Sequence, residues 1–458
     1  MDARQVVVVI GGAVAGSEAA VMAAERGALV VVIEQNARPY GKIEDGLPRW
    51  HAALRRKEFG RIDANLAHPN ILFVPRTRLG EELTLDELID EYGVGTVILA
   101  NGAWRDRHLG LTALDRFAGA GLIYQNPLVR WFNHHPDPGW TGPSYALADG
   151  AIVIGGGLAS LDVVKILNLE LYQRALAARG IDVDVVELEH SGIDKVLEAH
   201  ALTPEALGVR GCTLFYRRSA EDMPLATDAD PTPERLARLR KTRLKILDKV
   251  LRRYLVNFEP NAVACGVLVE DERLAGLVFR RTRAEDGGGV VEVPGSEFEV
   301  RSQLVVSSIG SLPEPLPGIP MKRDVYAFRD WDTGELDAER GIYGLGNVLT
   351  GRGNIKESRQ SAREVVRRLA ERRHAGELDL DTASEEAHAA ARREASEVLD
   401  QALARPAMPG ERVEALVARV YRRWDEVGYG GDYAGWIAAH RPWDWTEDEI
   451  SGGEDGDD

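Results

Sequence analysis

The chain has 458 residues, enough to bury two or three domain cores, and its 44% hydrophobic and 28% charged composition is usual for a globular protein. Its net charge of −17 argues against nucleic-acid binding, which requires a basic surface. No apolar stretch reaches the roughly 18 residues that a membrane-spanning helix needs.

The N-terminal residues predict a βαβ unit. Residues 5–10 have the continuous hydrophobic character of a buried parallel strand, 14–26 predict a helix, and 29–34 predict a second strand. Because the first strand starts within five residues of the N-terminus, we expect no signal or transit peptide and a cytoplasmic location. A short strand, a helix capped by Thr84 and a buried strand are predicted next, at 72–74, 84–92 and 96–100.

The turn of this first unit has the spacing Gly11-x-Ala13-x-x-Gly16, with alanine at the middle position. Such a turn lets a pyrophosphate approach the N-terminus of the following helix. Glu34 falls 18 residues after Gly16, where an acid can hydrogen-bond the ribose hydroxyls of an adenosine. An acid at this position favours FAD over NADP, and the alternative is a tight turn that binds nothing.

The middle of the chain predicts a second βαβ unit. Residues 105–148 contain many turn-forming residues and predict a connection between domains. The second unit starts at 151, and its helix is expected at 158–176. An insertion with short helices at 184–210 precedes the strand at 212–216.

The second glycine turn has the spacing Gly155-x-Gly157-x-x-Ser160. No acid ends the following strand, and Arg217 and Arg218 stand there instead. Guanidinium groups suit a 2′-phosphate by charge and by bidentate geometry, so this turn favours NADP over NAD. The alternative is a solvated strand end.

The rest of the chain predicts a basic helix, an antiparallel region and a helical C-terminal part. Residues 234–253 carry leucines at helical spacing beneath a cationic outer face. The sequence ends in an acidic tail at 452–458 that we expect to be disordered. Between them, strands are predicted at 261–281, 291–306, 304–310 and 341–346, and helices at 356–373 and within 380–427.

Only two cysteines are present, Cys212 and Cys265, and no CxxC motif occurs. A redox-active disulfide of the CxxC type and a four-cysteine iron–sulfur cluster are therefore excluded within this chain. We predict no metal site.

Five motifs in this order resemble the adrenodoxin-reductase family of ferredoxin–NADP reductases. Pro39–His51 is similar to the family's proline–aromatic–glycine loop, which leads to a histidine. Leu128–Asn133 resembles the Trp-aromatic-Asn segment before the NADP domain, and Gly155–Asp162 resembles the Gly-x-Gly-x-x-Ala-Leu-Asp motif with serine in place of alanine. Ser308–Gly310 and Tyr433–Trp436 resemble motifs near the return to the FAD domain and in the C-terminal segment.

The resemblance implies an α/β fold with two Rossmann-like domains, one for FAD and one for NADP, and a helical C-terminal extension. The expected division is a first part of the FAD domain, the NADP domain, a second part of the FAD domain and the extension, at 1–105, 106–319, 320–375 and 376–458.

The resemblance also implies roles for individual residues. His51 and Asp162 would be the polar pair near the flavin and the nicotinamide, and Arg217 and Arg218 would hold the 2′-phosphate. Besides the two glycine turns and Glu34, the expected cofactor-binding positions are Gly41, Gly46, Gly102, Gly346, Asn347 and Gly353.

The chain departs from the family pattern at four positions. Glu44 stands where the family has an arginine, and Lys42 and Asp45 replace other family residues of the same loop. Asn347 replaces a tryptophan, so it can bond a ribityl hydroxyl but cannot stack.

The expected function is hydride transfer from NADPH to FAD, followed by transfer of single electrons to a ferredoxin-like carrier. The basic helix 234–253 is the expected docking surface for such an acidic partner, with a solvated helix face as the alternative. Two other functions stay open. One is a NADPH-oxidising subunit of a larger complex, although the missing cysteines argue against glutamate synthase. The other is a non-catalytic FAD-binding protein, which Glu44, Asp45 and Asn347 allow.

Overall fold

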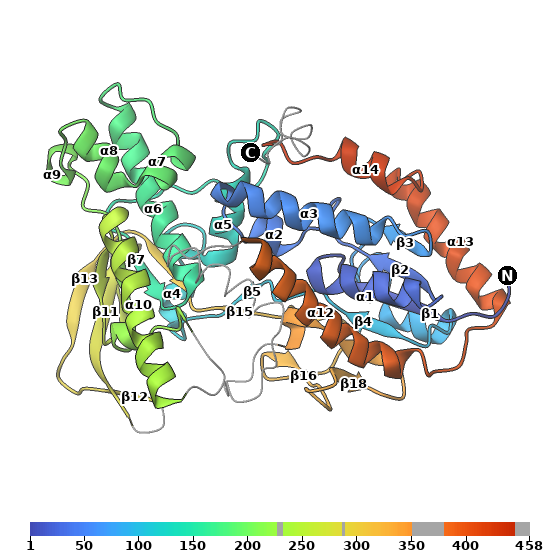
Figure 1. Cartoon of the computed structure of the whole chain (residues 1–458). Helices are drawn as coiled ribbons and strands as arrows, with labels where there is room; N and C mark the ends of the chain where they lie inside the picture. The colour runs from blue at the N-terminus through green and yellow to red at the C-terminus, as the bar shows by residue number, and fades with distance from the viewer. Residues whose placement is uncertain (227–231, 286–288, 350–379, 445–458) are drawn as a thin grey trace.

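The structure is a computed structural model that describes residues 1–226, 232–285, 289–349 and 380–444. It has two lobes, one built from the N-terminal and C-terminal parts of the chain and one from the middle part (Figure 1). The predicted helix 356–373, Gly353 and the acidic tail lie outside the described residues. Within the described ranges, no helix is long and apolar enough to cross a membrane.

The first lobe contains a six-stranded sheet with the order β18-β19-β4-β1-β2-β3. All neighbours are parallel except the β18–β19 pair. Both faces of this sheet are covered, which is why β1 and β2 are hydrophobic without alternation. The strands, in chain order, are β1 (Val6–Ile10), β2 (Leu29–Ile33), β3 (Ile71–Val74), β4 (Val97–Leu99), β18 (Glu335–Asp337) and β19 (Ile342–Gly344).

Helices from both ends of the chain cover this sheet. On one face, Val7 and Val9 belong to the same core as α1 (Val14–Glu25), α3 (Ala52–Leu66) and α12 (Leu380–Ala402), and α12 lies beside α1 (Figure 1). On the other face, Val6 and Val8 belong to a core that includes α13 (Gly410–Val427). The predicted C-terminal helices are thus present, and they complete the core of the first lobe.

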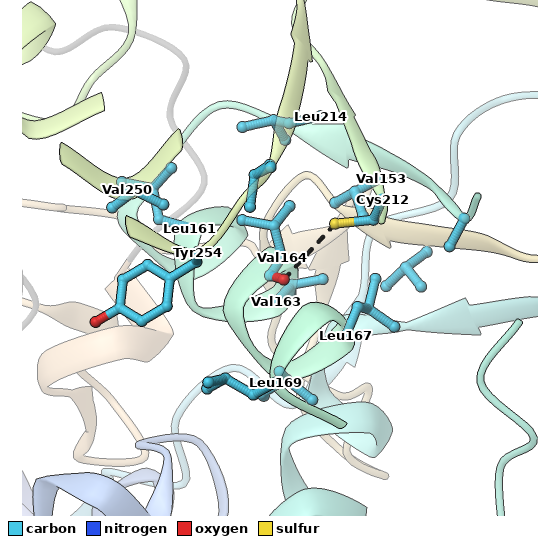
Figure 2. Close-up of a cluster of buried hydrophobic side chains, with 14 of the residues drawn as sticks. Val153, Leu161, Val163, Val164, Leu167, Leu169, Cys212, Leu214, Val250 and Tyr254 are labelled. Carbon is cyan, nitrogen blue, oxygen red and sulfur yellow. Dashed lines mark hydrogen bonds between the residues drawn. The ribbon is translucent and has the colours of Figure 1, made fainter. Parts of the chain in front are cut away.

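The second lobe contains a five-stranded parallel sheet with the order β6-β14-β7-β8-β9. Its core lies between the sheet and α6 (Leu158–Ala177), and Figure 2 shows Val164 and Leu167 of α6 beside Val153 of β7, Leu214 of β8 and Cys212, which directly precedes β8. The Cys212 thiol donates to the Val164 carbonyl oxygen at 3.6 Å (Figure 2). The strands are β6 (Leu122–Tyr124), β7 (Ile152–Gly155), β8 (Thr213–Phe215), β9 (Asn257–Glu259) and β14 (Val305–Ser308).

Other elements complete the second lobe. The prediction that 105–148 is only a connection was wrong in part, because it contains edge strand β6 and helix α5 (Gln125–His134). The predicted basic helix is α10 (Pro233–Arg253). The remaining helices are α4 (Thr112–Asp115), α7 (Val185–Ser191), α8 (Ile193–Ala199) and α9 (Pro204–Leu207), and an antiparallel sheet consists of β10 (Ala262–Glu270), β11 (Arg273–Ala284), β12 (Val290–Glu292) and β13 (Phe298–Arg301).

Two short strands connect the lobes. β5 (Arg105–Asp106) pairs antiparallel with β15 (Ser311–Leu312), so the segment that leaves the first lobe lies beside the segment that returns to it (Figure 1).

Cys212 is buried, Cys265 is half-buried, and both are free thiols. The smaller elements are α2 (Lys42–Asp45), η1 (Arg49–His51), η2 (Glu87–Glu91), η3 (Ala220–Asp222), β16 (Met321–Lys322), β17 (Val325–Tyr326), η4 (Gly346–Leu349) and α14 (Tyr433–Ala439).

Candidate dinucleotide sites

The first glycine turn lies between the end of β1 and the start of α1. Neither Gly11 nor Gly16 leaves room for a Cβ atom. Gly11 has a φ of +96°, and a Cβ there would lie 2.7 Å from the Ala100 carbonyl oxygen. A Cβ on Gly16 would lie 1.8 Å from the Gly11 carbonyl oxygen. Ala13 is the N-cap of α1, and no side chain within the described residues caps this helix. The N–H groups of the first turn of α1 are therefore free of a side-chain cap and can hold an anion.

Glu34 lies directly against this turn. Its carboxylate accepts hydrogen bonds from the backbone N–H groups of Gly12, at 3.0 Å, and Asn36, at 2.9 Å. The side chain is buried, and burial raises the pKa of its carboxyl group to about 7 despite these two bonds. The predicted acid is thus fixed by the turn itself, next to the start of α1.

Other predicted positions converge on the start of α1. A Cβ on Gly41 would lie 2.9 Å from the Ala13 side chain, and one on Gly346 would lie 2.8 Å from that of Ala15. Gly41, Gly102 and Gly346 all have positive φ angles. The sequence did not identify Glu394 of α12, whose carboxyl group accepts a hydrogen bond from the Gly346 N–H and whose pKa burial raises to about 7.

We predict that Gly16→Ala abolishes FAD binding, because its Cβ would overlap the Gly11 carbonyl oxygen and displace the turn. The purified variant should be colourless, as judged by its absorption between 350 and 500 nm. Gly60→Ala is the matched control, since Gly60 is in α3 and its Cβ would meet nothing within 4 Å. A Gly16→Ala protein with the same flavin content as Gly60→Ala would contradict the assignment of this turn.

The loop that departs from the family pattern, residues 38–51, is anchored by partners of its own. Glu44, which stands where the family has an arginine, forms an ion pair with Arg38 of the same loop. Asp45 bonds the His134 ring at 2.7 Å, and the Lys42 amine donates to Asn126 at 3.1 Å. The replaced residues therefore fasten the loop to itself and to α5.

Asn133, from the predicted Trp-aromatic-Asn segment, holds the same loop. Its side-chain amide donates to the carbonyl oxygens of Glu44, at 2.7 Å, and Leu47, at 2.9 Å, and its oxygen accepts from the Arg49 N–H at 2.9 Å. Gly46, also predicted to contact cofactor, lies within this clamped stretch as the C-cap of α2. The clamp fixes the course of the chain toward His51.

The second glycine turn lies between β7 and α6. A Cβ on Gly155 would lie 2.5 Å from that of Ser160, whose hydroxyl donates to the Gly157 carbonyl oxygen at 2.5 Å. A Cβ on Gly157 would meet nothing within 4 Å, and no side chain among the described residues caps α6. The N-terminus of this 20-residue helix is therefore open to an anion.

Arg217 and Arg218 follow β8, next to this turn in the sheet. Arg217 is exposed and Arg218 is half-buried. Their carbonyl oxygens accept hydrogen bonds from the Thr282 hydroxyl, at 2.8 Å, and the Asn261 N–H, at 3.1 Å, which fixes the backbone. The ring of Tyr216 lies over Gly156, where a Cβ would be 2.1 Å from it. Two cations thus lie on a rigid strand end.

His51 and Asp162 come from different lobes. His51 ends η1 and is buried, whereas Asp162 is half-exposed in the first part of α6. Lys165, three residues after Asp162 on the same side of α6, lines one cleft together with His51. The structure therefore brings the His51 loop against the side of the helix that carries Asp162.

These features define a fold with two dinucleotide-binding domains, the second inserted between the N-terminal and C-terminal parts of the first. The proteins to which the chain is similar in sequence are named as reductases. The chain is 27% identical over 349 residues to the mitochondrial NADPH:adrenodoxin oxidoreductase of Arabidopsis thaliana, covering 69% of each chain. It is 26% identical over 365 residues to the NADPH-ferredoxin reductase FprA of Mycobacterium leprae, covering 75% of this chain and 76% of the relative. No protein-family model matches.

Solved structures agree with the fold. The structure of Mycobacterium tuberculosis FprA in complex with NADPH covers 92% of this chain and 90% of its own at a TM-score of 0.61 and 18% identity. A histidine-to-glutamine mutant of the same protein gives a TM-score of 0.61 at 19% identity. The predicted fold class and the resemblance to adrenodoxin-type reductases are confirmed, and the names of these relatives agree with the predicted enzyme class and with NADPH.

Proposed function

We propose that this protein is a NADPH-dependent FAD oxidoreductase that passes electrons to a ferredoxin-like carrier. The observation that carries the proposal is the pair of glycine turns, each at a helix N-terminus that no side chain of the described residues caps, with Glu34 at one and Arg217–Arg218 at the other. Two dinucleotides of different type in one chain suit electron exchange between them. A cytoplasmic location stays a prediction.

The residues present fit both cofactors. At the first turn, the N-terminus of α1 would hold the FAD pyrophosphate, and Glu34 would accept from ribose hydroxyls. At the second turn, the N-terminus of α6 would hold the NADPH pyrophosphate, and Arg217 and Arg218 would bind its 2′-phosphate. When bound, FAD supplies acceptance of a hydride and release of single electrons.

His51 and Asp162 are the proposed polar pair beside the reacting rings. An imidazole can hold or relay a proton near neutral pH, and a carboxylate beside it can orient the group that receives the proton. His51 is buried, and the Asn133 clamp fixes the backbone of the loop before it. Both free cysteines are isolated thiols, so electrons would leave toward a separate carrier.

The cationic face of α10 is the proposed docking surface for an acidic carrier. Arg238, Lys241 and Lys245 are exposed on it, while Leu239 and Ile246 face the core. Against a net charge of −17, such a concentrated positive face can steer an acidic partner toward this lobe.

Reversing charge on this face should slow electron transfer. We expect Arg238→Glu combined with Lys241→Glu to lower the second-order rate of ferredoxin reduction at low salt by about tenfold or more. Stopped-flow absorption after mixing NADPH-reduced protein with ferredoxin measures that rate. Arg301→Glu, an exposed residue of β13, is the control for a change of charge elsewhere on the same lobe.

Two results would decide against this part of the account. No turnover of ferredoxin at low salt by the unaltered protein would exclude a ferredoxin-like acceptor. An equal loss of rate in the α10 variant and in Arg301→Glu would exclude α10 as the docking surface. Flavin reduction by NADPH, followed in the same variants, separates docking from the first half-reaction.

A further inference from the structure

The cationic face of α10 carries charges with which no carboxylate of the described residues pairs. Arg238, Lys241 and Lys245 follow one another at spacings of three and four residues, so they form one exposed row along the helix. None of the three has an ion-pair partner within the described ranges, whereas Arg252, further along the helix, pairs with Asp248. A row of unpaired cations therefore lies on a helix of 21 residues, which is about 30 Å long.

The described part of the chain ends at Asp444, at the junction of the two lobes. The Asp444 carboxylate lies 3.2 Å from the guanidinium of Arg55, in the first turn of α3. The ring N–H of Trp443 donates to the Asn133 carbonyl oxygen of α5, also at 3.2 Å. These two contacts fix the point from which residues 445–458 continue.

This point lies within reach of α10. Arg55 follows His51 by one helical turn, and His51 lines the same cleft as Val250 of α10. The 14 residues 445–458 can extend over about 46 Å at most, which exceeds the length of α10. The segment after Asp444 is therefore long enough to reach the cationic face.

Residues 445–458, here called the acidic segment, have the charge that the cationic face lacks. The segment contains no lysine or arginine and seven acidic residues, which are Glu447, Asp448, Glu449, Glu454, Asp455, Asp457 and Asp458. Attachment to the same chain gives such a segment an effective concentration on the order of millimolar near a surface that it can reach. Weak electrostatic contacts are sufficient for binding at that concentration.

We propose that the acidic segment binds the cationic face of α10 in the same molecule. An acidic electron carrier must then displace the segment before it can dock on α10, so the segment acts as a built-in competitor. The intramolecular contact does not depend on the proposed function. The competition rests on it, because it requires α10 to be the docking surface of the carrier.

Carbodiimide crosslinking of the full-length protein at low ionic strength tests the contact, because this reagent joins a carboxylate to a lysine amine when the two are adjacent. We expect mass spectrometry to find the acidic segment joined to Lys241 or Lys245. These products should disappear at 1 M salt, where charges are screened beyond about 3 Å. Lys57 of α3 and the exposed Lys195 of α8 are the comparison amines, and in a mixture of ¹⁵N-labelled and unlabelled protein each product should contain one isotope only.

Three outcomes of this experiment would overturn the proposal. The first is the absence of crosslinks from the acidic segment to α10. The second is an equal yield of crosslinks to Lys57 or Lys195, which would show contact without preference for the cationic face. The third is a set of mixed-isotope products alone, which would place the segment on a second copy of the chain.

The competition is tested by neutralising the first three acids of the segment with Glu447→Gln, Asp448→Asn and Glu449→Gln together. We expect the second-order rate of ferredoxin reduction at low salt to rise about threefold, because the competitor is weakened. The matched control removes the same charge from α13, with Glu411→Gln, Asp425→Asn and Glu426→Gln, and should leave the rate nearly unchanged.

An equal rise of rate in both triple variants would attribute the effect to net charge and overturn the competition, as would no rise in either. If the protein did not reduce ferredoxin at all, the proposed acceptor would be wrong, but the crosslinks would still report the contact. A failure of the proposed function therefore stays distinguishable from a failure of this inference.

Discussion

Replacing Arg217 and Arg218 together with alanine should raise the KM for NADPH by about a hundredfold and leave the KM for NADH nearly unchanged. A hydrogen bond to a charged group contributes about 1.5–3 kcal/mol, and the two proposed contacts to the 2′-phosphate would form only with NADPH. A hundredfold change corresponds to about 2.7 kcal/mol. Steady-state reduction of ferricyanide at varied NADPH and NADH measures both constants.

Arg301→Ala is the control for this prediction. Arg301 is an exposed arginine of the same lobe, and its ion pair with Glu270 is a surface pair of small energetic value. Its KM for NADPH should match that of the unaltered protein. If the double variant raised both KM values equally, the strand end would support folding or a shared part of the nucleotide instead of selecting the 2′-phosphate.

The second large effect concerns a buried histidine that fastens the C-terminal helix α12 to the first lobe. The His388 ring is fully buried and bridges two buried carboxylates, Glu18 of α1 at 2.6 Å and Glu58 of α3 at 2.8 Å. We expect His388→Ala to lower the free energy of unfolding by about 3–5 kcal/mol, because it takes a shared partner away from two buried carboxylates, although Arg61 and Arg392 still pair with Glu18. Urea denaturation followed by circular dichroism measures this change.

The same cluster predicts a pH dependence of stability. Burial alone would lower the pKa of His388, but its hydrogen bonds to Glu18 and Glu58 outweigh burial and raise it above the ordinary 6.5. Its contribution is therefore complete below pH 6.5 and is lost as the pH rises through the raised value. Burial alone would raise the pKa of Glu18, but His388 lowers it below 4.5, so that contribution is lost in acid. Stability from this cluster should be highest between about pH 4.5 and 6.5.

Arg26→Gln is the control for His388→Ala, because it removes an exposed contact between α12 and the first lobe instead of a buried one. Arg26 pairs with Asp400 of α12 at 2.7 Å, on the surface, and such pairs contribute about 1 kcal/mol or less. The His388→Ala protein should also lose the decline in stability above pH 6.5. Equal costs for the two variants, or an unchanged pH profile in His388→Ala, would contradict a charged bridge.

The sequence predicted those elements whose formation depends on residues close together along the chain. β1, α1 and β2 follow from hydrophobic runs around a glycine turn, and α6 and α10 were placed to within a residue of their bounds. β6 and β9 were missed, and each is ordered by pairing with a neighbouring parallel strand, β14 or β8. Such pairing leaves no signal in the short segment itself.

The candidate sites divide in the same way. The glycines, Glu34 and the arginine pair could be predicted as cofactor-binding residues because their spacing along the chain indicates that role. The partners that compensate for Lys42 and Asp45 lie in α5, more than 80 residues away along the chain, so the sequence showed only unexplained departures. Glu394 of α12 lies almost 50 residues after Gly346 in the chain, and no local pattern indicated their contact.

NADPH should reduce a flavin that is bound by this chain. Anaerobic visible absorption of the purified protein tests it directly. We expect a yellow protein whose flavin band near 450 nm is bleached by one equivalent of NADPH and far more slowly by NADH. A protein that carries flavin but is not bleached by NADPH would contradict the account and would leave a non-catalytic FAD-binding protein.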